Sequence, residues 1–142
     1  MKIKFSVKSK IDKEETLRLA KAVLFKAMVK MHELAVINCP VDTGRLKNSI
    51  ILKPTSPGYQ NYLLSDGTDY GISVEFGTAP HFTSAKNLVG WSRRVLGNKD
   101  AAYAVAKKIA KKGTEAQPWM RPALFQVKEI WIKRYWEQGL SK

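Results

Sequence analysis

Hydrophobic and polar positions in the first forty residues predict a short strand and then a long helix. Residues 3–7 alternate between apolar and polar side chains, which is the period of a strand with one buried face. From about residue 13 to Asn38 the apolar positions step by three and four, as in an amphipathic helix. The predicted stripe consists of Leu17, Ala20, Leu24, Ala27, Met31 and Leu34. Asp12 and Glu15 have the spacing of a capping box, and Pro40 ends the helix because proline disfavours helical backbone before it.

Three further strands are expected in the middle of the chain. Ile50–Leu52 and Tyr62–Leu64 are apolar or β-branched runs, separated by a loop rich in proline, serine and glycine. Tyr70–Phe76 alternates, which places Ile72, Val74 and Phe76 on one face. Asp66-Gly67 is typical of a tight hairpin turn between the last two strands.

Helical spacing returns after the last expected strand. Residues 84–97 carry Leu88, Trp91 and Val95 on one side, and residues 99–112 carry Ala102, Val105 and Ile109. Gly113 is typical of a helix end. A final helix is predicted from Pro118 to about Gln138, with proline near its start.

The final helix has two apolar stripes, and a helix packed on one core needs one. The first consists of Met120, Ala123, Leu124, Val127 and Trp131. Phe125, Ile132 and Trp136 form the second, about 140° away around the helix. Aromatic side chains near basic residues are typical of protein interfaces, so the second stripe is predicted to contact a neighbouring subunit.

Together these elements predict a single α+β domain over residues 1–142, a length that suits one domain. A small antiparallel sheet of about four strands would pack against the long N-terminal helix and the C-terminal helix. Residues 81–117 would form a helical insertion between the last strand and the last helix. A lone cysteine, Cys39, favours folding in a reducing compartment, and no apolar run is long enough to span a membrane.

Positive charge is concentrated in the terminal segments. The chain has 25 lysines and arginines against 12 aspartates and glutamates, a formal net charge of +13. A basic surface favours phosphate or acidic protein partners. Lys107, Lys108, Lys111 and Lys112 are the best candidates for contacting nucleic-acid phosphates without reading bases. Solvated lysines on the back of a helix explain the same run equally well. Because the net charge is strongly positive, a basic nucleic-acid-binding module is the main alternative function.

The sequence gives little support for a catalytic site. Asp42-Thr43-Gly44 matches the active-site triplet of aspartic proteases, but it follows a helix and a proline and precedes Arg45. Cys39 with His32 or His81 would make a nucleophile and base, although a lone cysteine at a helix end is more often buried. Two histidines and one cysteine, widely spaced, do not predict a zinc site, and no cofactor motif is present. We therefore expect no enzyme activity, no metal and no cofactor.

Three segments stand in a fixed order along the chain. They are Cys-Pro-Val-Asp-Thr-Gly-Arg-Leu-Lys-Asn-Ser-Ile at 39–50, Tyr-Gly-Ile-Ser-Val-Glu-Phe-Gly-Thr at 70–78, and Gln-Pro-Trp-Met-Arg-Pro-Ala-Leu at 117–124. The series resembles the neck and tail-completion proteins of tailed phages, also described as head–tail joining or minor tail proteins. Trp119-Met120 replaces the pair beginning with phenylalanine that is more usual in that family.

The resemblance implies an oligomeric ring, most simply a hexamer, around the DNA path of the virion neck or tail. It implies assembly in the host cytoplasm with other neck, connector and tail-tube proteins, non-specific contact with genomic DNA, and no catalysis. Its motif residues are Pro40, Asp42, Thr43, Gly44, Arg45, Glu75, Gly77, Pro118 and Pro122.

Elementary chemistry predicts roles for several of these motif residues. Asp42 and Thr43 offer cap oxygens for a short helix, and Gly44 allows a close turn. Glu75 is expected to pair with Arg45 or with backbone amides of the 42–45 turn. Gly77 permits a positive φ after the strand.

Overall fold

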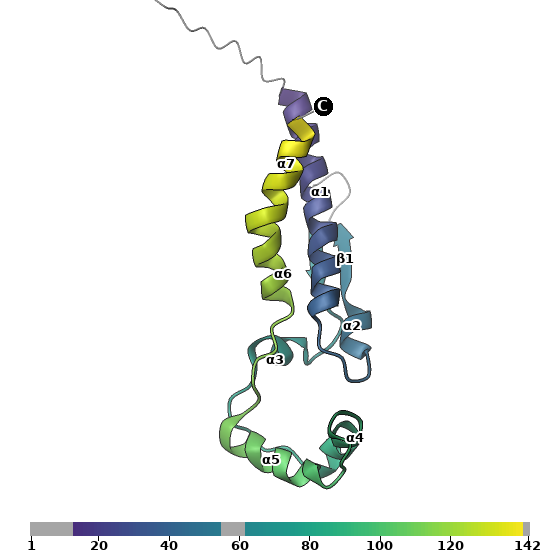
Figure 1. Cartoon of the computed structure of the whole chain (residues 1–142), viewed down its shortest axis with the longest axis vertical. Coiled ribbons are helices and arrows are strands. Elements are labelled where there is room, and N and C mark those ends of the chain that lie inside the picture. The colour runs from purple at the N-terminus through teal and green to yellow at the C-terminus, as the bar shows by residue number, and fades with distance from the viewer. Residues whose placement is uncertain (1–12, 55–61, 141–142) are drawn as a thin grey trace, which may run out of the picture.

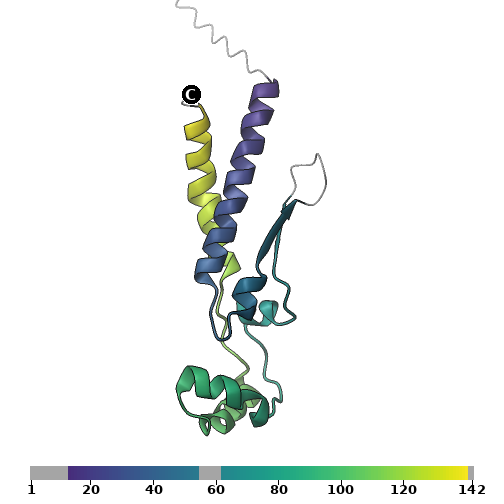
Figure 2. The same ribbon diagram turned by 90° about the vertical axis from the view of Figure 1, so that its right-hand side faces the viewer.

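The structure is a computed structural model that describes residues 13–54 and 62–140. It confirms the mixed α+β class, with helices predominating. Figures 1 and 2 show a long antiparallel helical hairpin, a two-stranded hairpin beside it, and a helical lobe at the end far from the C-terminus. The expected strand at 3–7, the cap at Asp12 and most of the loop after Pro54 lie outside the described residues.

Helix α1 (Lys13–Asn38) forms one arm of the hairpin and ends just before Pro40, as predicted. Its buried residues are Val23, Ala27, Met31 and Ala35, each four positions after the last. The predicted stripe is therefore right at Ala27 and Met31 and wrong at Leu17, which is exposed. The reason is that the packed row follows the i+4 ridge of the helix, whereas the predicted stripe alternated steps of three and four.

Helix α2 (Arg45–Ser49) leads into strand β1 (Ile51–Pro54), which pairs antiparallel with β2 (Tyr62–Ser65). Ile51 lies opposite Ser65, and Pro54 lies opposite Tyr62. Both strands agree with the prediction to within two residues. Among the described residues the sheet has these two strands, so the expected sheet of about four strands is not supported.

The strand expected at residues 70–76 is wrong, because Gly71–Phe76 forms helix α3. Ile72 and Phe76, two of the three residues assigned to a buried face, are exposed. The inward residues are Gly71 and Glu75, with Val74 half-buried, a spacing of three and four that fits a helix. The turn before it joins a strand to a helix, so it is not a hairpin turn either. In this turn Asp66 Oδ1 accepts hydrogen bonds from the backbone N–H and the hydroxyl of Thr68.

Helices α4 (Ala85–Leu96) and α5 (Ala101–Lys112) form the separate lobe at the lower end of Figure 1, and both agree closely with the prediction. They pack mainly against each other. Their contact is built from small or short side chains, with Ser92, Ala102, Ala106 and Ile109 buried. Ser92 Oγ also donates to the carbonyl oxygen of Asn98, which closes the turn between the helices.

The second arm of the hairpin contains three consecutive parts: α6 (Met120–Gln126), a π-helical turn η1 (Val127–Trp131) and α7 (Ile132–Leu140). Ala123 and Val127 are buried against α1, but Leu124, predicted on the same stripe, is exposed. A π turn holds more residues than an α turn. Val127 at its start and Trp131 at its end both pack against the core, as residues four apart would in an α-helix too.

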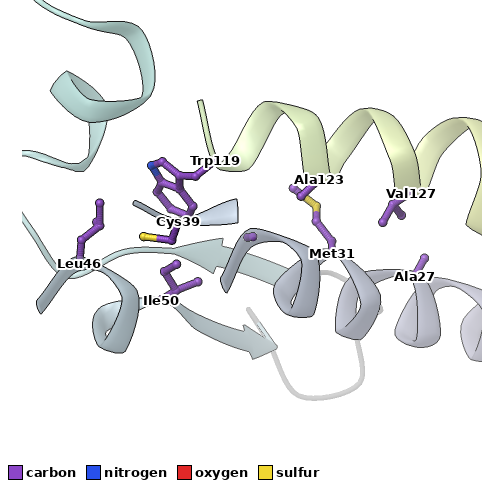
Figure 3. Packing of buried hydrophobic residues seen from close by; sticks show 9 residues of the cluster. Ala27, Met31, Cys39, Leu46, Ile50, Trp119, Ala123 and Val127 are labelled. Carbon is purple, nitrogen blue, oxygen red and sulfur yellow. The ribbon is translucent and has the colours of Figure 1, made fainter. Parts of the chain in front are cut away.

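Trp119 closes the lower end of the core. Its side chain is 1% exposed. Figure 3 shows it above Cys39 with Leu46 and Ile50 nearby, while Met31 and Ala123 meet farther along the two helices. The entry to α6 is thus packed against the junction of α1, α2 and β1.

Candidate functional site

Glu75 is a buried carboxylate that caps the start of the last helix. Its Oε2 accepts hydrogen bonds from the backbone N–H groups of Trp119 at 2.7 Å and Met120 at 2.9 Å. Its Oε1 accepts from the backbone N–H of Arg121 at 3.0 Å and from Arg121 Nε at 2.9 Å. Arg121 Nη2 also donates to the carbonyl oxygen of Glu75 at 3.0 Å. Helix α3 therefore supplies the cap of α6 from a distant part of the sequence.

The first turn of α6 needs this cap because N–H groups at a helix start have no partner inside the helix. Three of them, from Trp119 to Arg121, donate to Glu75. The next residue is Pro122, which has no N–H to satisfy. With Glu75 as acceptor and Pro122 lacking an N–H, every backbone N–H group in the first turn of α6 has a partner. This explains why the chain carries both the Glu75 motif and the Pro122 motif.

The Glu75 site holds a stable anion. Burial alone would raise the pKa of Glu75, but hydrogen bonds from the backbone N–H groups of Met120, Trp119 and Arg121 outweigh it. With the Arg121 side chain they bring the pKa below its usual value. An ionised carboxylate only accepts hydrogen bonds, so this group is suited to holding backbone in place and not to delivering a proton.

The chain crosses to the lobe and back through two paired segments, 77–84 and 113–119, which we call the waist. Thr78 and Thr114 form an isolated antiparallel bridge with N–H···O distances of 3.1 and 3.2 Å. Their hydroxyl oxygens lie 3.0 Å apart. Gly77 and Gly113 flank the bridge with φ of +73° and +74°, as expected for Gly77. A Cβ on Gly113 would overlap the carbonyl oxygen of Thr78, so both the backbone angle and the close approach require glycine.

The expected partner of Glu75 is wrong. Its oxygens face the start of α6, and Arg45 is exposed on α2. The expected side-chain cap of α2 is also wrong, because the cap position is Gly44, in the left-handed region at φ +81°. Thr43 Oγ1 reaches only the N–H of Arg45, at 3.5 Å. Asp42 stands two residues before the cap position, and its carboxylate is bound by Arg94.

Asp42 instead ties the lobe to the hairpin. Arg94 of α4 donates from Nε to Asp42 Oδ1 at 2.6 Å and from Nη2 to Oδ2 at 2.7 Å. The hydrogen bond from Arg94 lowers the pKa of Asp42. This planar two-bond contact joins the turn after α1 to the lobe, so the lobe is held at two places, the waist and the Asp42–Arg94 pair.

In the described residues, the side chains considered for catalysis each have another environment or partner. Cys39 is buried, and burial raises the pKa of its thiol. His32 Nε2 lies 3.1 Å from the carbonyl oxygen of Ile50, and His81 Nδ1 lies 3.0 Å from that of Ala79. Asp42 is bound by Arg94, an arrangement unlike a proton-sharing pair of aspartates. Within residues 13–54 and 62–140 no cluster of His, Cys, Asp and Glu could hold a metal ion.

The residues predicted to contact a neighbour lie on the hairpin, away from the lobe (Figure 1). Phe125 is 61% and Ile132 is 42% exposed, and Trp136 is half-buried. Other large apolar side chains of the hairpin are also exposed: Leu17, Phe25, Val29, Ile37, Leu124, Ile130 and Leu140. Many exposed large apolar side chains on one element are consistent with a protein contact surface there. The contact itself stays a prediction.

The four lysines of α5 are all exposed on the lobe, at the opposite end of the molecule from α7 (Figure 1). Lys108 Nζ lies 2.8 Å from Glu115 Oε1, so this lysine is paired within the chain. Lys107, Lys111 and Lys112 extend the basic surface beside it. The structure places the four lysines on one exposed helix, and their contact with a partner stays a prediction.

Sequence reasoning missed Arg121, Arg94 and Thr114 as the partners of Glu75, Asp42 and Thr78. A signal existed for Arg121, which stands inside the 117–124 motif between two prolines. Arg94 and Thr114 lie in the 81–117 insertion, where spacing along the chain gives no indication of a distant partner.

Comparisons of the chain with protein-family models, with curated proteins and with solved structures find no match. In the described part of the chain, no helix combines the length and apolarity needed to cross a membrane.

Proposed function

We propose that this chain is a structural subunit of a tailed-phage or prophage particle, one copy in a ring at the head–tail junction. In this role it acts without catalysis, metal or cofactor. It assembles in the host cytoplasm and meets other neck, connector and tail-tube proteins in the virion. We expect the ring to be a hexamer around the DNA path.

The observation that carries the proposal is the exposed apolar surface of the helical hairpin. A monomer in water gains nothing from exposing Phe125, Ile132 and their neighbours, because burying each would release apolar surface from water. A second subunit packed on this face would bury it. Ring contacts between copies of one chain pair different surfaces of the same subunit, which suits a hairpin with apolar side chains on both arms.

The motif contacts give a second line of support. Glu75 from one motif and Trp119, Met120 and Arg121 from another meet at the start of α6. Asp42 from the first motif attaches the lobe through Arg94. The three motifs therefore serve architecture, as expected of a chain whose role is to present surfaces to neighbours.

The hairpin contact is tested by Phe125→Ser and Trp136→Ala. Both variants should keep a folded helical chain but weaken self-association by about tenfold or more, since buried aromatic residues dominate interfaces. Multi-angle light scattering across a dilution series measures the mass. Ile72→Ser is the matched control, because Ile72 is 74% exposed on α3, away from the hairpin arms. Full-size oligomers of Trp136→Ala at every dilution would contradict this contact.

The main alternative is a basic nucleic-acid-binding module, which the exposed lysines of α5 favour. A ring subunit should form symmetric oligomers whether or not DNA is present. A nucleic-acid binder should instead bind DNA as a monomer or dimer, with an affinity that falls steeply as salt rises.

A further inference from the structure

A shallow apolar hollow on the lobe is bordered by two aromatic rings that the fold leaves in water. Phe82 is 89% exposed and Tyr103 is 72% exposed. They line a hollow of about 350 Å³ together with Ala106 and Ala110 of α5. Neither ring contributes to the buried core of the lobe. Apolar rings around a concave surface are typical of a site that receives an apolar side chain.

Positive charge surrounds the same hollow. Lys107 lines it, and the exposed Lys111 follows one turn later on α5. Ser84 and Ala85, at the start of α4, line it as well, and a helix start carries partial positive charge. Residues 81–117 hold eight basic and two acidic side chains, an excess of six positive charges. The hollow therefore favours an occupant that is apolar at its centre and acidic around it.

The charge balance argues against a second copy of this chain as the occupant. The chain carries a formal net charge of +13, so a second copy would add positive charge to a positive surface. Several acidic groups are already engaged, among them Glu75 with Arg121 and Asp42 with Arg94. Duplex DNA would satisfy the lysines, but its backbone offers no apolar group for the rings of Phe82 and Tyr103.

We propose that the Phe82–Tyr103 hollow docks an acidic segment of another protein, whose apolar side chain inserts between the rings while its carboxylates meet Lys107 and Lys111. The apolar anchor would provide most of the affinity, and the lysines would steer the encounter. This surface lies on the lobe, apart from the hairpin face. Its test therefore does not depend on whether the chain forms a ring.

The test measures fluorescence anisotropy of a short labelled peptide of glutamates and aspartates around a central Phe-Leu pair. A second peptide replaces that pair by Ser-Ser and keeps the charge. The full chain should bind the anchored peptide about tenfold more tightly than the Ser-Ser peptide. Tyr103→Ser and Phe82→Ser should remove most of that difference. Both rings are exposed, so these variants should keep the helical circular dichroism of the parent chain.

A second set of variants tests the contribution of the lysines separately from that of the peptide's apolar side chain. Lys107→Glu combined with Lys111→Glu should weaken both peptides, whereas Lys128→Glu combined with Lys133→Glu, the same charge change on the hairpin, should weaken them much less. Equal binding of the two peptides by the parent chain would overturn the proposal. So would tighter binding of a short DNA duplex that Tyr103→Ser leaves unchanged, because the surface would then be a phosphate-binding one.

Discussion

Replacing Glu75 by alanine is expected to destabilise the chain by about 3–5 kcal/mol in total, because each buried N–H group left without an acceptor costs about 1–3 kcal/mol. The substitution leaves the N–H groups of Trp119, Met120 and Arg121 without an acceptor at the start of α6. Since Trp119 is part of the core, loosening this turn also loosens the packing above Cys39. Urea unfolding followed by circular dichroism measures the loss.

The contribution of Glu75 to the free energy of unfolding should decrease at acidic pH. Its pKa in the folded chain is lowered, so its stabilisation is fully present above the ordinary glutamate pKa of about 4.3. It is lost as the pH falls through the lower folded pKa, where the carboxylate takes up a proton. Glu75→Gln, which keeps the shape of the side chain, should therefore lie well below the parent in unfolding free energy near pH 7. The gap should narrow as the pH falls below the ordinary glutamate pKa and through the lower folded pKa.

Glu115→Ala is the matched control for Glu75. Its carboxylate also lies 2.8 Å from a cationic nitrogen, that of Lys108, but both side chains are mostly exposed. Exposed pairs contribute little, so this variant should unfold at the same urea concentration as the parent. A Glu75→Ala variant as stable as Glu115→Ala would show that the cap of α6 does not hold the fold together.

Gly113→Ala is expected to be the next most damaging change described here, at about 3 kcal/mol. About 1 kcal/mol or more comes from forcing a side chain to φ +74° and ψ −160°, a backbone region essentially confined to glycine. About 2 kcal/mol comes from displacing packed backbone, because the new Cβ would overlap the carbonyl oxygen of Thr78. The Thr78–Thr114 bridge should open, and amide exchange of both threonines should rise. Urea unfolding and hydrogen exchange measure the two effects.

Gly97→Ala is the control for a positive φ without a close contact. Gly97 lies in the left-handed α region at φ +68° and ψ +4°, and a Cβ there would meet nothing within 4 Å. It should cost only about 1 kcal/mol, the cost of a side chain in that region. Equal losses for Gly97→Ala and Gly113→Ala would mean that the close approach of the two waist segments contributes nothing to stability.

Local patterns predicted those parts of the fold in which neighbours along the chain decide the structure. The end of α1 before Pro40, both strands of the hairpin and the lobe helices follow from proline chemistry and apolar spacing. The apolar positions of residues 70–76 follow the period of a strand, so this pattern alone predicts the wrong element. Burial of Glu75, which serves α6, decides in favour of the helix, and that partner lies more than forty residues away.

The candidate site was predictable in its residues but not in its contacts. The resemblance to the phage neck family pointed to Asp42, Glu75 and Gly77, yet their partners are Arg94, Arg121 and the Thr114 segment. No periodicity relates residues that meet only after the lobe folds back on the hairpin. Leu124 is exposed because the packed row of the last helix steps by four through Ala123 and Val127, whereas the predicted stripe also included the neighbour of Ala123.

Native mass spectrometry of the purified full chain, supported by negative-stain images, tests the central claim most directly. The account predicts a closed symmetric ring, most simply a hexamer, that persists in the absence of DNA and loses mass with Phe125→Ser. A folded monomer at all concentrations, which associates only when DNA is added and dissociates as salt rises, would contradict it.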